Sequence, residues 1–220
     1  MQLIIYNGSP RNKKSNSKLL IEHFLKGYNS VNAENVKINY LAEIKKTEEH
    51  KSDFINADVV LLIFPLYADS MPGIVKLFIE NIYNIAFHQP KKIGFIVQSG
   101  FPEAIHSVGV EKYLKKLTQR MQCVYLGTVI KGGVEGIQIQ PTFMTKKLYS
   151  GFEQLGKTFA ETGNFDENIK AKFAKPYKMN PFGRFVFKML SYTGLTNFYW
   201  NSNLKKNKAY EKRFDKPYEK

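Results

Sequence analysis

The segment NGSPRNKKSNS, residues 7–17, gathers cations and hydroxyl groups where a strand is expected to end and a helix to begin. It contains Arg11, Lys13 and Lys14 together with three serines, and it contains no acidic residue. A helix start already carries about +0.5 of a charge, so cations there are unfavourable unless an anion binds among them. The unfavourable charge disappears if a phosphate binds there, because backbone N–H groups, hydroxyls and a guanidinium can all point at it. The segment therefore indicates a phosphate site, although solvated surface lysines give the same pattern.

Two common phosphate-binding motifs do not match this loop. In a Walker A motif, Lys13 stands where the second glycine is needed for the loop to curl around the phosphates. The strand expected at 58–64 also lacks an acidic residue at its end to help hold magnesium, so a nucleotide kinase is a weaker alternative. Since Gly8 is the only glycine in the loop, the dinucleotide fingerprint GxGxxG fails as well. A single phosphate fits the loop better than a polyphosphate.

The hydrophobic segments of the chain predict the elements that position this loop. Strands are expected at 2–7, 35–41, 58–64, 91–99 and 124–130, and helices at 17–28, 42–57, 72–83, 103–121 and 141–162. This alternation predicts an α/β fold, a doubly wound five-stranded parallel sheet with helices on both faces. In such sheets ligands bind beyond the carboxyl ends of the strands, where the strand order reverses. The loops NGSPRNKKSNS, PLYADSMPG and SGFPE follow three of these strands.

Together the three loops resemble the landmarks of the flavodoxin-like NAD(P)H-dependent FMN reductases and NAD(P)H:quinone oxidoreductases. NGSPRNKKSNS is similar to the phosphate loop of that family, FPLYADSMPGIVKLFIENI to its second landmark, and SGFPE to the loop that borders the flavin ring. The resemblance covers residues 1 to about 160. It implies an FMN-dependent oxidoreductase that passes hydride from NADH or NADPH through FMN to a small acceptor such as a quinone or a flavin, with ping-pong kinetics.

The same resemblance implies which residues hold the cofactor. The FMN phosphate would contact Ser9, Arg11, Ser15, Asn16 and Ser17. One edge and face of the isoalloxazine would meet Pro65, Leu66, Tyr67 and Ala68, and the other edge would meet Ser99, Gly100, Phe101 and Pro102, with Glu103 opening the next helix. No side chain is assigned a catalytic role, because His106 near the flavin loop has no evident partner. The segment KGGVEG, residues 131–136, either borders the nicotinamide or substrate or forms a plain turn.

Composition limits the other classes of function. The single cysteine, Cys123, excludes an internal disulfide and a cysteine-ligated zinc or iron–sulfur site, and no histidines share metal-ligand spacing. A net charge of +14 disfavours an electron-carrier flavodoxin, which is typically acidic and remains the alternative function. The start of the chain lacks a leader, and its longest apolar stretch, 59–68, is about half the length of a membrane-spanning helix. We therefore expect a cytoplasmic protein, with no nucleic-acid partner and no membrane contact.

The charge and the aromatic residues divide the chain into two expected parts. Residues 1–164 would form the flavodoxin-like FMN-binding domain. Residues 165–220 hold 13 basic against 5 acidic residues and 13 of the 31 aromatic residues. We expect this extension to form short helices near 182–195 and 197–210. It would pack on the core or reach across a homodimer, because so many exposed aromatic side chains would favour aggregation.

Overall fold

The computed structural model describes residues 2–32, 35–85, 89–194, 197–216 and 218–219, and it contains two compact units, 1–178 and 179–220. The boundary between the two units follows residue 178, whereas from the sequence it was expected between residues 164 and 165. The reason is a helix that the sequence pattern did not predict, α6 (Glu167–Phe173), which packs on the first unit. Phe165 and Phe173, at its two ends, are buried in the hydrophobic core.

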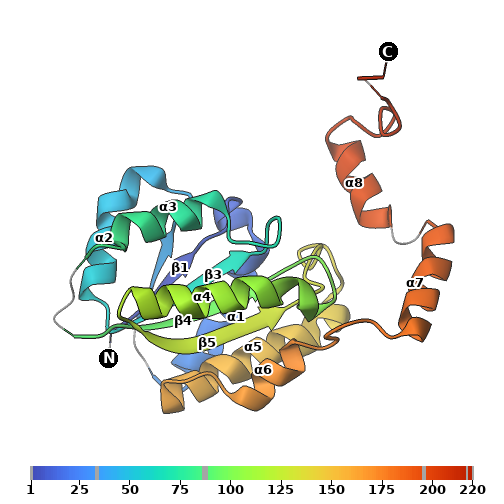
Figure 1. Cartoon of the computed structure of the whole chain (residues 1–220). Helices are drawn as coiled ribbons and strands as arrows, with labels where there is room; N and C mark the ends of the chain where they lie inside the picture. Colours follow the sequence, from blue (N-terminus) through green and yellow to red (C-terminus); the bar gives the residue numbers. More distant parts are fainter. Residues whose placement is uncertain (1, 33–34, 86–88, 195–196, 217, 220) are drawn as a thin grey trace. The chain divides into compact units, whose positions relative to one another are not determined.

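The first unit is built on a five-stranded parallel sheet (Figure 1). Its strands are β1 (Leu3–Asn7), β2 (Lys37–Tyr40), β3 (Val59–Pro65), β4 (Lys92–Gln98) and β5 (Val124–Lys131). Their order, β2-β1-β3-β4-β5, confirms the doubly wound fold. The order reverses between β1 and β3, so the loops that follow these two strands flank the expected binding crevice.

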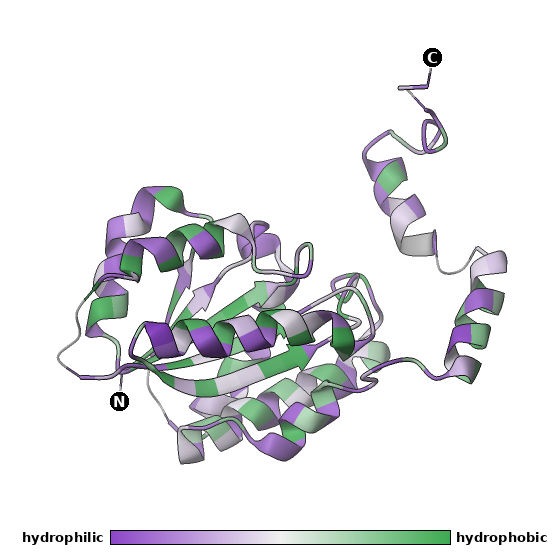
Figure 2. Ribbon diagram, in the orientation of Figure 1, coloured by the Kyte–Doolittle hydropathy of each residue, from purple (hydrophilic) through white to green (hydrophobic). Residues whose placement is uncertain are grey.

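Helices cover both faces of this sheet. One face is covered by α1 (Asn16–Asn29), α5 (Thr142–Thr162) and α6, and the other by α2 (Thr47–Asn56), α3 (Gly73–Ile82) and α4 (Val108–Arg120). Alternate residues of β3 point into the two cores: Val60, Leu62 and Phe64 into one, and residues 59, 61 and 63 into the other. Figure 2 shows the matching pattern, in which mostly hydrophobic strands lie between helices that carry both hydrophobic and hydrophilic residues.

Two glycines bring α1 and α5 into backbone contact. A Cβ atom on Gly27 would lie 1.7 Å from the carbonyl oxygen of Glu153, and one on Gly156 would lie 1.8 Å from the carbonyl oxygen of Phe24. Neither position therefore accommodates a side chain without separating the helices. Since α1 begins directly after the phosphate loop, this close contact fixes the position of the loop's helical end.

The second unit contains α7 (Pro181–Tyr192) and α8 (Phe198–Lys206). Asn180 caps α7, since its Oδ1 accepts a hydrogen bond of 2.7 Å from the backbone N–H of Gly183, and Pro181 suits the first helical position. The helix α8 falls within its expected segment, and α7 begins one residue before the start expected at 182; residue 195, the expected end of the first helix, lies outside the described residues. Among the residues that the structure describes, no helix is long and apolar enough to cross a membrane.

A buried histidine in α2 predicts how stability responds to acid. His50 is 2% exposed, its Nε2 lacks a hydrogen-bond partner among the described residues, and burial lowers its pKa. As the pH falls, the unfolded chain, in which a histidine has a pKa of about 6.5, therefore binds the proton first. We expect the free energy of unfolding of the apoprotein to decrease between about pH 7.5 and about pH 5.

Urea denaturation at the two pH values measures this loss. His50→Gln, which stays neutral throughout, should show a smaller loss than the wild-type protein. Equal pH dependence in the two proteins would show that His50 is not responsible.

Candidate functional site

Asn7, the last residue of β1, organises the loop that follows it. Its side-chain amide donates to Ser15 Oγ at 3.1 Å, and its Oδ1 accepts from the backbone N–H of Ser9 at 3.0 Å. Ser15 Oγ also accepts from the N–H of Lys18 at 3.2 Å and so caps α1. The loop is anchored to the neighbouring strand as well, because the N–H of Gly8 donates to the carbonyl oxygen of Ile63 at 2.8 Å.

One predicted phosphate-binding residue, Ser17, is completely buried, and its Oγ has no hydrogen-bond partner in the described part of the chain. An unpaired buried hydroxyl costs about 1–3 kcal/mol, and a ligand bound at the start of α1 would supply the missing partner. It lies in the first turn of α1, where the leading N–H groups have no intrahelical acceptor. With Ser9 and Arg11 in the same loop, this set of donors fits the phosphate of FMN.

Asn16 connects the phosphate loop to the chain that follows β5. Its side-chain amide donates to the carbonyl oxygen of Val134 at 2.8 Å, and its Oδ1 accepts from Gln138 Nε2 at 3.0 Å. Gln138 Nε2 also lies 2.9 Å from the carbonyl oxygen of Lys14. The side chain of Asn16 is therefore already engaged, and the group that it offers to a phosphate is its backbone N–H.

A tight turn in the loop after β3 presents Tyr67. The backbone groups of Tyr67 and Ser70 exchange two hydrogen bonds of 2.9 Å, and Ala68 and Asp69 between them have φ values of 46° and 57°. Non-glycine residues rarely adopt this left-handed conformation, and backbone strain of this kind is typical of functional sites. Tyr67 is 45% exposed, so the turn holds an aromatic ring outside the core.

Glycines in the loop after β5 allow it to support the loop after β4. The N–H of Gly133 donates to the carbonyl oxygen of Phe101 at 2.9 Å, and the N–H of Val134 to that of Ser99 at 3.0 Å. A Cβ atom on Gly132 would lie 2.4 Å from the oxygen of Phe101 and 2.6 Å from that of Pro102. The segment KGGVEG is thus the backbone partner of the predicted flavin loop.

Replacement of Gly132 therefore tests this support. Gly132→Ala should displace the loop at 99–102 and weaken FMN binding by tenfold or more, because the new Cβ meets backbone atoms that have little freedom to move. Fluorescence titration of the apoprotein with FMN measures the loss. Gly73→Ala is the matched control, since no atom lies within 4 Å of its new Cβ. Equal affinity for FMN in both variants would contradict the assignment.

The three predicted loops meet around one small hollow of about 50 Å³ at the carboxyl ends of the strands. The predicted residues that line it are Ser9, Arg11, Asn16, Pro65, Leu66, Tyr67, Ser99 and Gly100. Two further lining residues were not predicted, Gln98 and Glu135. Gln98 is the last residue of β4, where the sequence pattern marked only the loop that follows. Glu135 belongs to KGGVEG, for which a place beside the nicotinamide or substrate was one of two interpretations, but it was not itself named as a site residue.

Six predicted residues do not line this hollow: Ser15, Ser17, Ala68, Phe101, Pro102 and Glu103. Glu103 Oε2 instead lies 3.6 Å from Nε2 of His106, whose ring is 4.7 Å from that of Phe101 between centroids.

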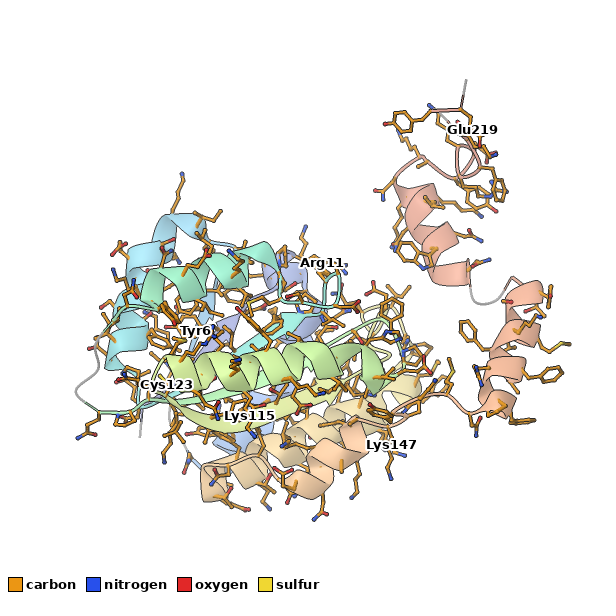
Figure 3. The ribbon with its side chains drawn as sticks, viewed as in Figure 1. Tyr6, Arg11, Lys115, Cys123, Lys147 and Glu219 are labelled. Carbon is orange, nitrogen blue, oxygen red and sulfur yellow. The ribbon has the colours of Figure 1, made fainter. Side chains whose placement is uncertain are left out.

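Arg11 is one of the residues that line the hollow, and its side chain is labelled in Figure 3. Its Nη1 lies 3.7 Å from Oε1 of Glu135, and about half of each side chain is exposed. An exposed pair at this distance is weak, about 0–1 kcal/mol, so the guanidinium can turn to a phosphate at little cost. Among the described residues, no group of three histidine, cysteine, aspartate or glutamate side chains is placed to hold a metal ion.

The comparisons with known proteins agree with this geometry. The model of the family described by its flavodoxin-like fold matches residues 1–154. The chain therefore belongs to that family. Among curated proteins, none matches the sequence significantly.

Solved structures share the fold at low sequence identity. An NADPH-quinone reductase from P. pentosaceus is 17% identical, with a TM-score of 0.56, and the match covers 70% of this chain and 96% of that one. An NAD(P)H:quinone oxidoreductase from Methanothermobacter marburgensis is 13% identical, with a TM-score of 0.56 and coverage of 72% and 96%. An FMN-dependent NADH-azoreductase from Bacillus anthracis, solved in complex with FMN, is 18% identical, with a TM-score of 0.54 and coverage of 72% and 99%.

Proposed function

We propose that this protein is an FMN-dependent NAD(P)H oxidoreductase that reduces a small acceptor such as a quinone or a flavin. The observation that carries the proposal is the buried hydroxyl of Ser17 at the start of α1, which has no hydrogen-bond partner among the described residues and lies in the same loop as Ser9 and Arg11. Those groups supply the donors that a single phosphate needs, and their loop follows β1, one of the two strands between which the sheet order reverses. The similar structures named as quinone reductases and as an azoreductase support the same chemistry.

The chain's own residues would bind and orient the cofactor. Ser9, Ser17 and Arg11 would hold the phosphate, together with the first N–H groups of α1. Tyr67 on its strained turn would cover the ring, and the loop at 99–102, supported by Gly132 and Gly133, would border its other edge. When bound, FMN would supply the redox chemistry, accepting hydride from a reduced nicotinamide and passing it to the acceptor.

The alternative function is an electron-carrier flavodoxin that does not react with nicotinamides. One experiment separates the two functions. The protein purified with FMN should be yellow, and NADH or NADPH should bleach the flavin absorbance under anaerobic conditions. A flavin that dithionite bleaches and nicotinamides do not would favour the carrier. A protein that does not take up FMN would contradict both functions.

We also propose that residues 179–220 contribute to a homodimer or to the stability of the first unit. A truncation after Lys178 keeps α6, whose Phe173 is buried, so the first unit should still fold. The truncated protein should become monomeric in sedimentation or should aggregate. A truncation after Asn164 removes α6 as well and should unfold the first unit. A soluble dimer after the first truncation would show that this extension has neither role.

A further inference from the structure

A groove is lined by residues of α3 and α4. The two helices cover the same face of the sheet, and Figure 1 shows where they lie. Each helix lines the groove with residues at positions i, i+3, i+4 and i+7, which lie on one side of a helix. They are Lys76, Ile79, Glu80 and Tyr83 on α3 and the residue after it, and Tyr113, Lys116, Leu117 and Arg120 on α4. The α3–α4 groove has a volume of about 340 Å³, which is within the range of small-molecule sites.

The floor of the α3–α4 groove is apolar and its walls carry aromatic rings. Met71, Ile79 and Leu117 are between 7% and 9% exposed and form part of the larger core. Tyr83 and Tyr113 are 42% and 52% exposed, so their rings are accessible from the groove that they line. A flat aromatic ring that lies against these tyrosines would bury apolar surface and gain stacking interactions.

The charges of the groove select an anionic ligand. Lys76 donates to Glu80 across one turn of α3, so these two charges compensate each other. Lys116 and Arg120, one turn apart on α4, have no acidic partner within the part of the chain that the structure describes. The groove therefore has an excess of two positive charges next to two aromatic rings. Arginine and lysine placed in this way suit phosphate groups.

A second copy of the chain does not complement this surface. In a two-fold symmetric dimer each copy would meet the same face of its partner, so two surfaces that each carry an excess of positive charge would come together. Residues 179–220 hold nine basic and three acidic residues, so they do not supply the missing negative charge either. The charge thus favours a separate anionic ligand.

We propose that the α3–α4 groove binds a phosphate-bearing nucleotide, with Lys116 and Arg120 on its phosphates and the exposed ring of Tyr113 beside its base. Two sources share this chemistry. One is the adenosine diphosphate half of the nicotinamide reductant, which would reach the groove past Met71, shortly after the turn that presents Tyr67. The other is a free adenine nucleotide. The first source rests on the proposed function, and the second does not.

Calorimetric titration of the FMN-loaded protein with ADP tests the proposal. The double variant Lys116→Gln/Arg120→Gln should bind ADP at least tenfold more weakly than the wild type. The matched control, Lys112→Gln/Lys115→Gln, removes the same charge from α4 at residues that do not line the groove (Figure 3 labels Lys115) and should bind ADP as the wild type does. Tyr113→Phe should keep most of the affinity, and Tyr113→Ala should lose it. If the wild type shows no saturable ADP binding, or if the groove and control variants bind ADP equally, the proposal is wrong.

Two further measurements distinguish the reductant from a free nucleotide as the ligand. They also distinguish either ligand from a second copy of the chain. If the ligand is the reductant, ADP should inhibit competitively against NADPH, and the groove variant should raise the KM for NADPH by a factor similar to its loss of ADP affinity. If the ligand is a free nucleotide, the groove variant should lose ADP binding while its KM for NADPH stays the same. A groove variant that changes the sedimentation coefficient and leaves ADP binding unchanged would instead identify an interface between copies. Because the titration does not require turnover, it gives a result even if the proposed redox function fails.

Discussion

Ser17→Ala is expected to weaken FMN binding by roughly 10- to 100-fold, because a hydrogen bond to a charged group contributes about 1.5–3 kcal/mol. The same change should leave the stability of the apoprotein unchanged or raise it by up to about 1 kcal/mol, since it removes a buried hydroxyl that has no partner in the described structure. An affinity loss without a stability loss is characteristic of a side chain retained for a ligand. Titration with FMN and urea denaturation of the apoprotein measure the two effects.

Ser15→Ala is the matched control, two residues earlier in the chain. Its hydroxyl already accepts hydrogen bonds from Asn7 and from the N–H of Lys18. The loss of this helix cap should lower the free energy of unfolding by about 0.5–2 kcal/mol. Ser17→Ala should therefore lower mainly the affinity for FMN, whereas Ser15→Ala should lower mainly the free energy of unfolding. Unchanged FMN affinity in Ser17→Ala would remove the phosphate assignment.

The contact between α1 and α5 predicts the largest loss of stability. Gly27→Ala and Gly156→Ala each place a Cβ atom within 2 Å of a backbone carbonyl oxygen of the facing helix, so the helices must separate. Overpacking costs about 1–3 kcal/mol where side chains can adjust, and more is expected here because backbone atoms are in the way. We expect each variant to lose about 3 kcal/mol or more, which is a large part of the total for a domain of this size.

Gly109→Ala in α4 provides the comparison, because nothing lies within 4 Å of its new Cβ atom. An alanine at this helical position should leave stability unchanged or raise it by up to about 1 kcal/mol. Thermal and urea denaturation of the three variants measure the difference. If Gly27→Ala were as stable as Gly109→Ala, the close approach of the two helices would be wrong.

The fold was largely predictable because its elements have strong local patterns. The run at 58–64 is apolar on both faces, as a central parallel strand must be, and it forms β3 at the centre of the sheet. The helix α6 was missed because Glu167–Phe173 is short and charged, and tertiary contacts of Phe165, Ile169 and Phe173 with the core hold it on the first unit. A helix held by so few contacts does not need a regular helical repeat of apolar residues, which is the pattern that predicts helices from sequence.

The candidate site was predictable where it depends on strand ends and less so where it depends on long-range contacts. The strand–loop–helix pattern placed Ser9, Arg11 and Tyr67 at the edge of the sheet where the structure has them. The side chain of Asn16 is hydrogen-bonded to Val134 and Gln138, which lie more than a hundred residues later in the chain. The local spacing of residue types cannot predict such contacts.

The pair between Arg11 and Glu135 has a consequence for how the proposed site would take up FMN. Before FMN binds, the guanidinium forms only a weak, exposed pair with this carboxylate, so a phosphate that bound at Arg11 would take the carboxylate's place at little cost. The incoming phosphate would displace that carboxylate, and uptake would be an exchange of one anion for another. Such an exchange makes the affinity for the cofactor less sensitive to ionic strength than the number of nearby cations suggests.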